Sequence, residues 1–247
     1  MMSIPATHLG ATHLHAHHPN APAFDPQAFD AATGHHVRAC LNAADRDDHP
    51  YRHWYLNSVF PAAVAEALAT LPFAAPEIDD TRGRRETHNS TRTFLSTDNQ
   101  LLYPVCGAVA AAFQAPETVS TLARQFGVDL GGSSLRIEYC LDREGFWLEP
   151  HTDIGAKLFT MLVYLSTGPD AENLGTDIMD GPEGGHAGRA SGRFNTGLVF
   201  IPGSDTWHGF ARRPFQGIRR TIIINYVKPE WRARHELAFP TEPVGLP

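Results

Sequence analysis

Three residues in the second half of the chain have the types and the spacing to hold a metal ion. His151 and Asp153 are separated by one residue, and His208 follows 55 residues after Asp153. Residues i and i+2 of an extended strand point to the same face, so this imidazole and this carboxylate would project into one cavity. Two histidines and one carboxylate that leave coordination positions open suit non-haem Fe(II). Because a His-x-Asp pair also occurs by chance at strand ends, the interpretation depends on what accompanies it.

An arginine and a hydroxyl group follow at the start of the next apolar run. Arg219 stands eleven residues after His208, and Thr221 would share the strand face of Arg219. An arginine that enters an apolar strand is costly unless it meets an anion, and a bidentate pair with a carboxylate is the natural solution. A hydroxyl group two residues further on can donate to the same carboxylate. The sequence therefore predicts an anion-binding position shortly after the distal histidine.

From residue 131 on, short β-rich runs alternate with glycine, proline and aspartate turns. No amphipathic segment of helical length separates these runs, which favours an antiparallel sandwich or barrel over a parallel sheet. We therefore expect a mainly β fold with supporting helices, in which residues 131–228 form the β-core. The predicted strands are Ser134–Cys140, Phe146–His151, Leu158–Leu165, Thr176–Met179, Gly197–Ile201, Trp207–Ala211 and Thr221–Val227.

Residues 50–130 are predicted to form a mainly helical layer that supports this core. Proline in a first turn and glycine just after a last turn mark helix ends, as at Pro116 and Gly127. The predicted elements are a strand over Tyr51–Leu56, a helix opened by Pro61, a loop over residues 76–90, a short strand over Thr91–Ser96, and helices over Leu101–Phe113 and Pro116–Phe126.

Composition narrows the class of protein. A chain of 247 residues can bury a sizeable core, so we expect residues 38–247 to form one domain. Its three cysteines are widely spaced and form no C-x-x-C motif, which favours the reducing cytoplasm. The net charge of −7 argues against a nucleic-acid partner bound through a general basic surface. No apolar run approaches the roughly 20 residues of a membrane span, so no membrane partner is expected.

Histidine is the unusual component of this composition. The chain has 14 histidines, and seven of them lie in the first 36 residues. Residues 1–37 contain no lysine or arginine and no sustained apolar period, so we interpret them as a flexible, low-complexity arm. The histidines of this arm either collect metal ions or have no specific role. The second interpretation is favoured because a flexible segment does not fix ligand geometry.

Taken together, the chemically active residues resemble the pattern of the Fe(II)- and 2-oxoglutarate-dependent dioxygenases. That pattern is His-x-Asp/Glu, a distal His, and an Arg about ten residues further on, often followed by x-Ser. The surrounding residues are similar to those of the prolyl-hydroxylase-like branch: Tyr164-Leu165-Ser166 follows an apolar strand, and Gly-Leu-Val-Phe-Ile-Pro precedes the distal histidine. The resemblance covers roughly residues 134–227. The matching residues are His151, Asp153, His208 and Arg219, with Thr221 in the place of the serine.

The resemblance implies a double-stranded β-helix, which is a jelly-roll core. It also implies that the two histidines and the aspartate hold Fe(II) and that 2-oxoglutarate chelates this iron. The far carboxylate of 2-oxoglutarate would pair with Arg219 and Thr221, and Tyr164 and Tyr139 are further candidates for the same carboxylate. O2 is the other cosubstrate, and hydroxylation of the substrate would accompany the release of succinate and CO2.

The implied reaction and substrate can be narrowed further. Related halogenases replace the metal-binding carboxylate by a small residue, so Asp153 favours hydroxylation or another oxygenase outcome such as desaturation. The Arg-x-Asn-x-Thr-x-Arg signature of the nucleic-acid demethylases does not fit residues 219–225. This argues against an alkylated nucleic acid as the substrate. We expect a small molecule, such as an amino acid or a derivative, while peptidyl, sugar and lipid substrates remain open. Two alternatives remain open: a cupin-like Zn(II) or Mn(II) hydrolase or isomerase with the same ligands, and a non-catalytic jelly-roll binding module.

Two other cationic residues stand near the predicted strands. Lys157 lies between the His-x-Asp pair and an apolar run, so it either faces the pocket or forms a solvated strand end. Arg92 would either reach an anionic group of the substrate or form a surface ion pair, and the ion pair is favoured.

Overall fold

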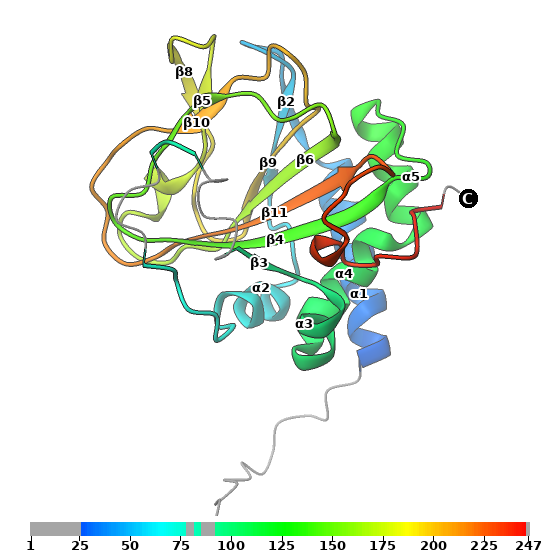
Figure 1. The fold of residues 1–247 in the computed structure, drawn as a ribbon. Coiled ribbons are helices and arrows are strands. Elements are labelled where there is room, and N and C mark those ends of the chain that lie inside the picture. Colours follow the sequence, from blue (N-terminus) through cyan, green and yellow to red (C-terminus); the bar gives the residue numbers. More distant parts are fainter. Residues whose placement is uncertain (1–25, 78–81, 85–91, 246–247) are drawn as a thin grey trace, which may run out of the picture.

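The computed structural model of the chain describes residues 26–77, 82–84 and 92–245 (Figure 1). The predictions for residues 1–25 and for most of the loop over 76–90 concern segments outside the described residues. The α-helices are α1 (Pro26–Asn42), α2 (Ala62–Ala69), α3 (Thr97–Leu102), α4 (Pro104–Gln114) and α5 (Pro116–Phe126). Two 3-10 turns are η2 (Ala171–Leu174) and η3 (Arg234–Glu236).

The strands form two antiparallel sheets that do not close into a barrel. In the larger sheet the order is β1-β2-β9-β6-β11-β4-β3, and in the smaller sheet it is β5-β10-β7-β8. The larger sheet contains β1 (Asp45–Asp47), β2 (His53–Asn57), β3 (Thr93–Phe94), β4 (Ser134–Asp142), β6 (Lys157–Tyr164), β9 (Thr196–Phe200) and β11 (Arg219–Val227). The smaller sheet contains β5 (Leu148–His151), β7 (Asp177–Met179), β8 (His186–Arg189) and β10 (His208–Phe210).

This architecture is the mainly β fold with supporting helices that the sequence predicts. The region predicted as the helical layer also supplies β2 and β3 to the larger sheet, so the layer and the β-core are continuous. The short strands β1 and β8 were not predicted. Among the described residues, no helix combines the length and the apolar character needed to cross a membrane.

Side chains alternate between two environments along β4, β6 and β11, the central strands of the larger sheet. One set, including Ile137 and Ile224, is fully buried in the main apolar core. The opposite set is largely polar, although it also contains Leu162 and Ile223, and its members Arg136 and Asn225 are buried as well. Successive residues of a strand point to opposite faces, so the sheet separates an apolar layer from a polar layer.

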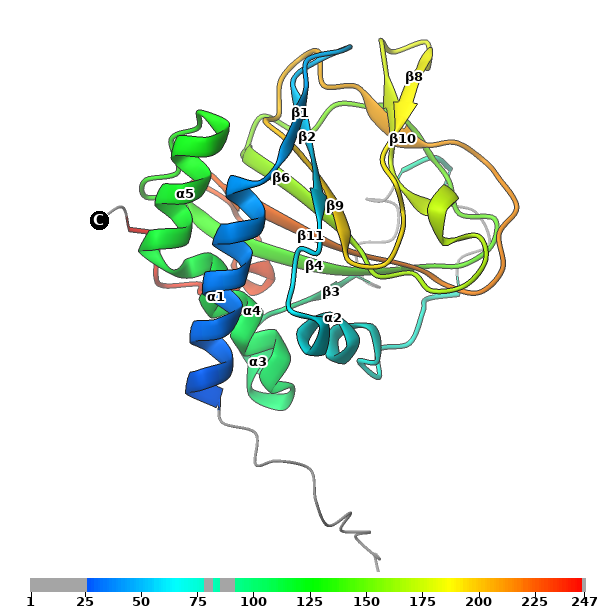
Figure 2. The ribbon, with the colours of Figure 1, turned by 180° about the vertical axis from the view of Figure 1, so that it is seen from behind.

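Helices cover the apolar face of the larger sheet (Figures 1 and 2). Residues of α1, α2, α4 and α5 share one core cluster with the inward side chains of β4, β6 and β11. The buried hydroxyl of Tyr226 donates to the carbonyl oxygen of Phe113 at 2.5 Å, which ties β11 to α4. The helical layer therefore holds the sheet from behind and leaves its polar face to the smaller sheet.

The prediction of a flexible arm over residues 1–37 is wrong for residues 26–37, because these residues form most of α1. Val37 and Leu41 are fully buried, and α1 packs against α4 and α5 (Figure 2). The segment contains four alanines and two histidines and has few large apolar residues. Most of the stability of a helix in a protein comes from tertiary packing, which the sequence of one short segment does not reveal.

The predicted helix over Leu101–Phe113 is two helices in the structure. Tyr103 is extended, with φ −127° and ψ 100°, and separates α3 from α4. A residue that precedes a proline is disfavoured in the helical region, and Pro104 then occupies the first turn of α4. The helix over Pro116–Phe126 is confirmed, and Gly127 ends it in the left-handed conformation at φ 69°.

We predict that Leu41→Ala lowers the free energy of unfolding by about 2–5 kcal/mol, because it leaves a cavity in the main core. Urea denaturation followed by circular dichroism measures the change. His35→Ala, at an exposed position of the same helix, is the matched control and should change stability by less than about 0.5 kcal/mol. Equal effects of the two substitutions would show that α1 is not part of the cooperative fold.

Candidate active site

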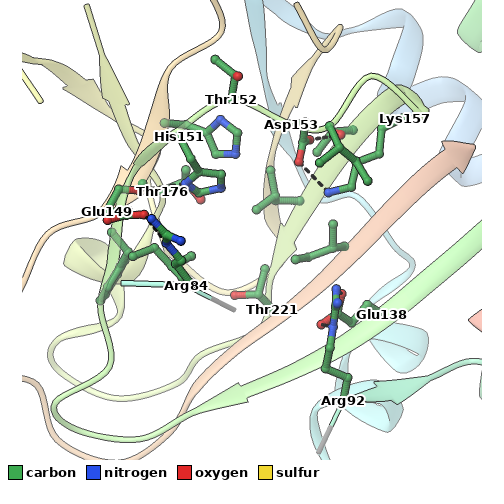
Figure 3. Close-up of a pocket in the computed structure, with 18 of the residues that line it drawn as sticks. Arg84, Arg92, Glu138, Glu149, His151, Thr152, Asp153, Lys157, Thr176 and Thr221 are labelled. Carbon is green, nitrogen blue, oxygen red and sulfur yellow. Dashed lines mark hydrogen bonds and ion pairs between the residues drawn. The ribbon is translucent and has the colours of Figure 1, made fainter. Parts of the chain in front are cut away.

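A pocket of about 490 Å³ lies between the two sheets. Strands β5 and β10 supply one wall, and β4, β6 and β11 supply the other (Figure 3). His208 on β10 pairs directly with His151 at the end of β5, and the centroids of the two rings are 4.3 Å apart. Antiparallel pairing therefore brings together two histidines that are far apart in the sequence.

Each of these rings is oriented by the main chain two residues before it. The Nδ1 atom of His151 lies 2.8 Å from the carbonyl oxygen of Glu149, and that of His208 lies 2.9 Å from the carbonyl oxygen of Thr206. A carbonyl oxygen can only accept, so each Nδ1 carries the proton of the neutral ring and each Nε2 keeps its lone pair. Histidines that bind metals are held in this way. The pair therefore presents two Nε2 donors in fixed tautomers.

His208 is neutral near pH 7. Burial, followed by the neighbouring His151, lowers its pKa to about 4, because a charged imidazolium would lose its hydration at this position. A neutral imidazole is the form that binds a metal ion.

Asp153 lies just beyond the end of β5, where its carboxylate meets a cation and a hydroxyl group (Figure 3). The Nζ atom of Lys157 lies 2.5 Å from Oδ1, and the hydroxyl of Thr160 lies 2.6 Å from Oδ2. Burial by itself would raise the pKa of Asp153, but the charge of Lys157 and the hydrogen bonds from Lys157 and Thr160 hold this pKa well below its usual value. The carboxylate is therefore ionised.

Within the described ranges, no three His, Cys, Asp or Glu side chains are grouped closely enough to hold a metal ion as they stand. Figure 3 shows Asp153 directed toward Lys157, away from the ring of His151. The chemistry of the donors nevertheless fits Fe(II), since two imidazoles whose Nδ1 atoms are held by main-chain carbonyl oxygens stand side by side and an ionised carboxylate interacts with one of them. A divalent ion bound here would take the place of Lys157 as the counter-charge of Asp153.

Arg219 and Thr221 lie on the pocket side of β11, as the strand alternation predicts. The Nη1 atom of buried Arg219 lies 2.6 Å from Oδ2 of Asp142, and its Nε lies 2.8 Å from the carbonyl oxygen of Leu174. The chain itself therefore supplies an anion for this arginine. Thr221 is fully buried, and its hydroxyl has no hydrogen-bond partner among the described residues. Such a group carries a free-energy cost that a polar ligand in the pocket would remove.

The two tyrosines named as candidates have different positions. Tyr139 is on the opposite face of β4, where its hydroxyl donates to the carbonyl oxygen of Leu68 at 2.6 Å, so its assignment to the pocket is wrong. Tyr164 is on the correct face of β6 and pairs with Thr221 on β11. Its oxygen accepts a hydrogen bond of 3.1 Å from the backbone N–H of Thr176. The contact of Tyr164 with a bound carboxylate stays a prediction.

A network of charges forms the part of the wall contributed by β3, β4 and η3. Arg92 holds the buried carboxylate of Glu138 through two contacts, of 2.8 Å and 2.5 Å. Arg136 reaches the same carboxylate at 3.2 Å and Glu236 at 2.6 Å, and it lies over the ring of Phe94. Arg92 thus forms an ion pair, but in the pocket wall instead of on the open surface. Lys157 also lines the pocket, so it is not a purely solvated strand end.

Several residues that line or support the pocket were not singled out from the sequence. They share one signal, which is a polar residue at alternate positions of an otherwise apolar strand. Arg136 and Glu138 are two apart on β4, while Thr160 and Asn225 each interrupt an apolar run. On an apolar strand that faces a helical layer, this pattern indicates a second buried face with its own hydrogen bonds.

Comparisons with known proteins bear on the fold. No protein-family model and no curated protein matches the sequence. A prolyl hydroxylase from Trichoplax adhaerens, solved in complex with a hypoxia inducible factor oxygen degradation domain peptide, superposes with a TM-score of 0.53 at 14% identity, over 84% of this chain and 94% of that chain. A prolyl-4-hydroxylase from Pseudomonas putida gives 0.50 at 15% identity, over 88% and 99%. A prolyl 4-hydroxylase from Phytophthora capsici gives 0.52 at 14% identity, over 88% and 70%.

These similarities cover the helical layer as well as the β-core, because they extend over more than four fifths of the chain. They establish that the chain has the fold of the prolyl hydroxylases and confirm the predicted jelly-roll core. At about 15% identity they carry the fold alone.

We predict that the metal-free protein loses stability through His208 as the pH falls. The folded pKa of about 4 lies below the ordinary value of 6.5, so between these values the unfolded chain binds a proton that the folded protein does not. The free energy of unfolding of the wild type should therefore fall over this range relative to that of His208→Asn. Urea titrations of both proteins at several pH values between 7 and 4.5 measure the difference. A difference independent of pH would contradict a buried, neutral His208.

Proposed function

We propose that the protein is an Fe(II)- and 2-oxoglutarate-dependent dioxygenase that hydroxylates its substrate. The observation that carries this proposal is the juxtaposition in one pocket of two different sites. On one side, two adjacent histidines have preset tautomers, and the ionised carboxylate of Asp153 lines the same pocket. On the other wall, buried Arg219 lies near the buried hydroxyl of Thr221, which has no partner among the residues that the structure describes. A metal ion and a dicarboxylate that bind in one pocket would use both of these sites, the first for the metal and the second for a carboxylate.

Each group of residues has a defined task in this proposal. His151, Asp153 and His208 would hold Fe(II), while Arg219 and Thr221 would orient the far carboxylate of 2-oxoglutarate. A guanidinium has five N–H donors, so a contact with Asp142 and one with a cosubstrate are not exclusive. Bound iron and 2-oxoglutarate supply the activation of O2, with release of succinate and CO2. The chain supplies binding, orientation and the exclusion of water.

The alternatives use only part of this arrangement. A Zn(II) or Mn(II) hydrolase or isomerase would need the three metal ligands but would have no use for an unpartnered hydroxyl beside a buried arginine. A non-catalytic binding module would not need two histidines held in the ligand tautomer. The dioxygenase uses every one of these groups, and the shared fold with prolyl hydroxylases supports it.

Two substrate classes follow from different observations. We propose a small molecule, such as an amino acid or a derivative, because the pocket has the size of a small-ligand site and must also hold 2-oxoglutarate. A proline-containing peptide is the second candidate, since the Trichoplax structure of the same fold contains a peptide. The reducing cytoplasm is the proposed location. Mass spectrometry of products from amino acids and proline-containing peptides distinguishes the substrate classes, because hydroxylation adds one oxygen atom.

We predict that the purified protein, supplied with Fe(II), 2-oxoglutarate and O2, forms succinate and that Asp153→Ala abolishes this turnover. The aspartate is the only carboxylate among the three proposed ligands, and its loss leaves the iron with two imidazoles. Succinate release measures turnover, and circular dichroism shows that the variant is folded. Full turnover by a folded Asp153→Ala variant would remove Asp153 from the metal site. A zinc-dependent hydrolytic activity without 2-oxoglutarate binding would favour the first alternative.

We predict that Thr221→Val weakens 2-oxoglutarate binding roughly tenfold or more without lowering stability. A hydrogen bond to a charged carboxylate contributes about 1.5–3 kcal/mol, whereas in the free protein the hydroxyl has no partner to lose within the described part of the chain. Isothermal titration of 2-oxoglutarate into the Mn(II)-loaded protein measures the affinity, and urea denaturation measures stability. Thr221→Ser, which keeps the hydroxyl, should bind nearly as well as the wild type. Unchanged affinity in Thr221→Val would place the cosubstrate elsewhere.

A further inference from the structure

A series of buried, hydrogen-bonded polar side chains runs from strand to strand along one face of the larger sheet and ends at Asp153. The Nη1 atom of Arg136 lies 3.3 Å from Oδ1 of Asn225. The Nδ2 atom of Asn225 lies 2.9 Å from the hydroxyl oxygen of Thr160, and that hydroxyl lies 2.6 Å from Oδ2 of Asp153. These side chains come from three adjacent strands: Arg136 from β4, Asn225 from β11 and Thr160 from β6. All three are at most 2% exposed.

Arg136, the first member of this series, determines the direction of each hydrogen bond that follows. A guanidinium can only donate, so the Asn225 oxygen must face Arg136 and accept. The amide nitrogen of Asn225 must then face Thr160 and donate, which it does to the hydroxyl oxygen and, at 3.3 Å, to the carbonyl oxygen of Phe159. With its oxygen accepting from Asn225, the Thr160 hydroxyl directs its proton to Asp153. The cation on β4 thus orients the amide and the hydroxyl so that every donor points toward the carboxylate.

Arg136 is itself held firmly at the other end. Glu138 and Glu236 accept from it at 3.2 Å and 2.6 Å, and the rings of Phe94 and Trp231 lie against its guanidinium. A buried arginine with several partners has little freedom to rotate, and hydrogen-bonded chains in a poorly solvated interior polarise one another. The Arg136 end of this series of hydrogen bonds is therefore rigid. Thermal motion of a surface group does not reverse the direction of the hydrogen bonds.

We propose that Arg136, Asn225 and Thr160 form a one-way hydrogen-bond relay that positions Asp153 as a ligand with one oxygen available for the metal. The inference rests on the proposed function, because it assigns Asp153 to the metal. Thr160 holds Oδ2, so Oδ1 is the oxygen that Asp153 can offer to a cation, and in this structure that cation is the Lys157 ammonium. These three are positioning residues: they act on the metal through Asp153.

The first test removes or keeps the Thr160 hydroxyl. Partners that hydrogen-bond to metal ligands typically contribute 10–100-fold to metal affinity, so Thr160→Val should weaken Co(II) binding at least tenfold. Co(II) titrations followed by visible absorption measure the affinity and report the ligand set. Thr160→Ser should restore it, because serine keeps the donor. Thr118→Val, on α5 at a buried hydroxyl without a partner among the described residues, is the matched control and should bind Co(II) like the wild type. Wild-type affinity in Thr160→Val would overturn the relay.

The second test reverses the relay by replacing the amide donor of Asn225 with an acceptor. In Asn225→Asp the new carboxylate still accepts from Arg136, but it can no longer donate to Thr160, whose hydroxyl is drawn away from Asp153. The relay predicts weaker Co(II) binding. A simple charge effect predicts tighter binding, because a negative charge is added near the metal. Unchanged or tighter binding would therefore overturn the role of Asn225, whatever the effect of Thr160→Val.

A readout on the metal-free protein separates this inference from the proposed function. The side-chain N–H resonances of Asn225 should shift in Thr160→Val and stay near their wild-type positions in Thr160→Ser. If the wild-type protein binds neither Co(II) nor Fe(II), the proposed function fails, and this NMR comparison still decides whether the hydrogen bonds exist. If the wild type binds metal but the variants bind equally well and the resonances do not move, the relay fails and the proposed function stands.

Discussion

The alternation of side chains along β4, β6 and β11 is the constraint on which the rest of the structure depends. A strand has two faces, and in these strands both faces are buried, one under helices and one under the smaller sheet. The apolar face can be covered by any well-packed helical layer. The polar face can be buried only if its charges and hydrogen-bonding groups find partners, because an unpaired buried charge is strongly destabilising. The pocket is built from this second face.

The polar face meets that requirement through pairs and chains instead of single contacts. Arg219 pairs with Asp142, the residue opposite it on the neighbouring strand. Arg136 joins Glu138 and Glu236, so that a central strand and the segment near the C-terminus are bound together. Such networks hold their members in defined positions once every group is satisfied. The unpartnered hydroxyl of Thr221 stands out against this background, and it lies where a ligand would bind.

Strand pairing, and not side-chain pairing, places the two histidines in the same pocket. Pairing of β10 with β5 puts His208 opposite His151, and main-chain carbonyl oxygens set the tautomer of each ring. Asp153, beyond the end of its strand, is not placed by sheet pairing and depends on side chains of the larger sheet, Lys157 and Thr160. The two sheets therefore contribute different parts of the candidate metal site, and their packing decides how the parts meet.

Much of this could be predicted from local rules. Short strands without crossover helices indicate antiparallel sheets, and a period of two places Arg219 and Thr221 on one face. Proline and glycine marked the limits of α5. Tyr139 was a candidate only through the resemblance, and strand alternation contradicts it: Arg136 and Glu138 put the odd-numbered positions of β4 on the other face. Pro104 likewise carried the signal that divides α3 from α4.

The sequence by itself thus determined the class of fold, the residues that share a strand face and the residue types available for metal and anion binding, because these follow from local geometry. Only the tertiary structure decided the partners. It showed that α1 is part of the core, that Asp142 meets Arg219, and that Lys157 and Thr160 hold Asp153. Periodicity orients a side chain within its own strand, whereas its partner depends on strand register and sheet packing, which join residues distant in the sequence.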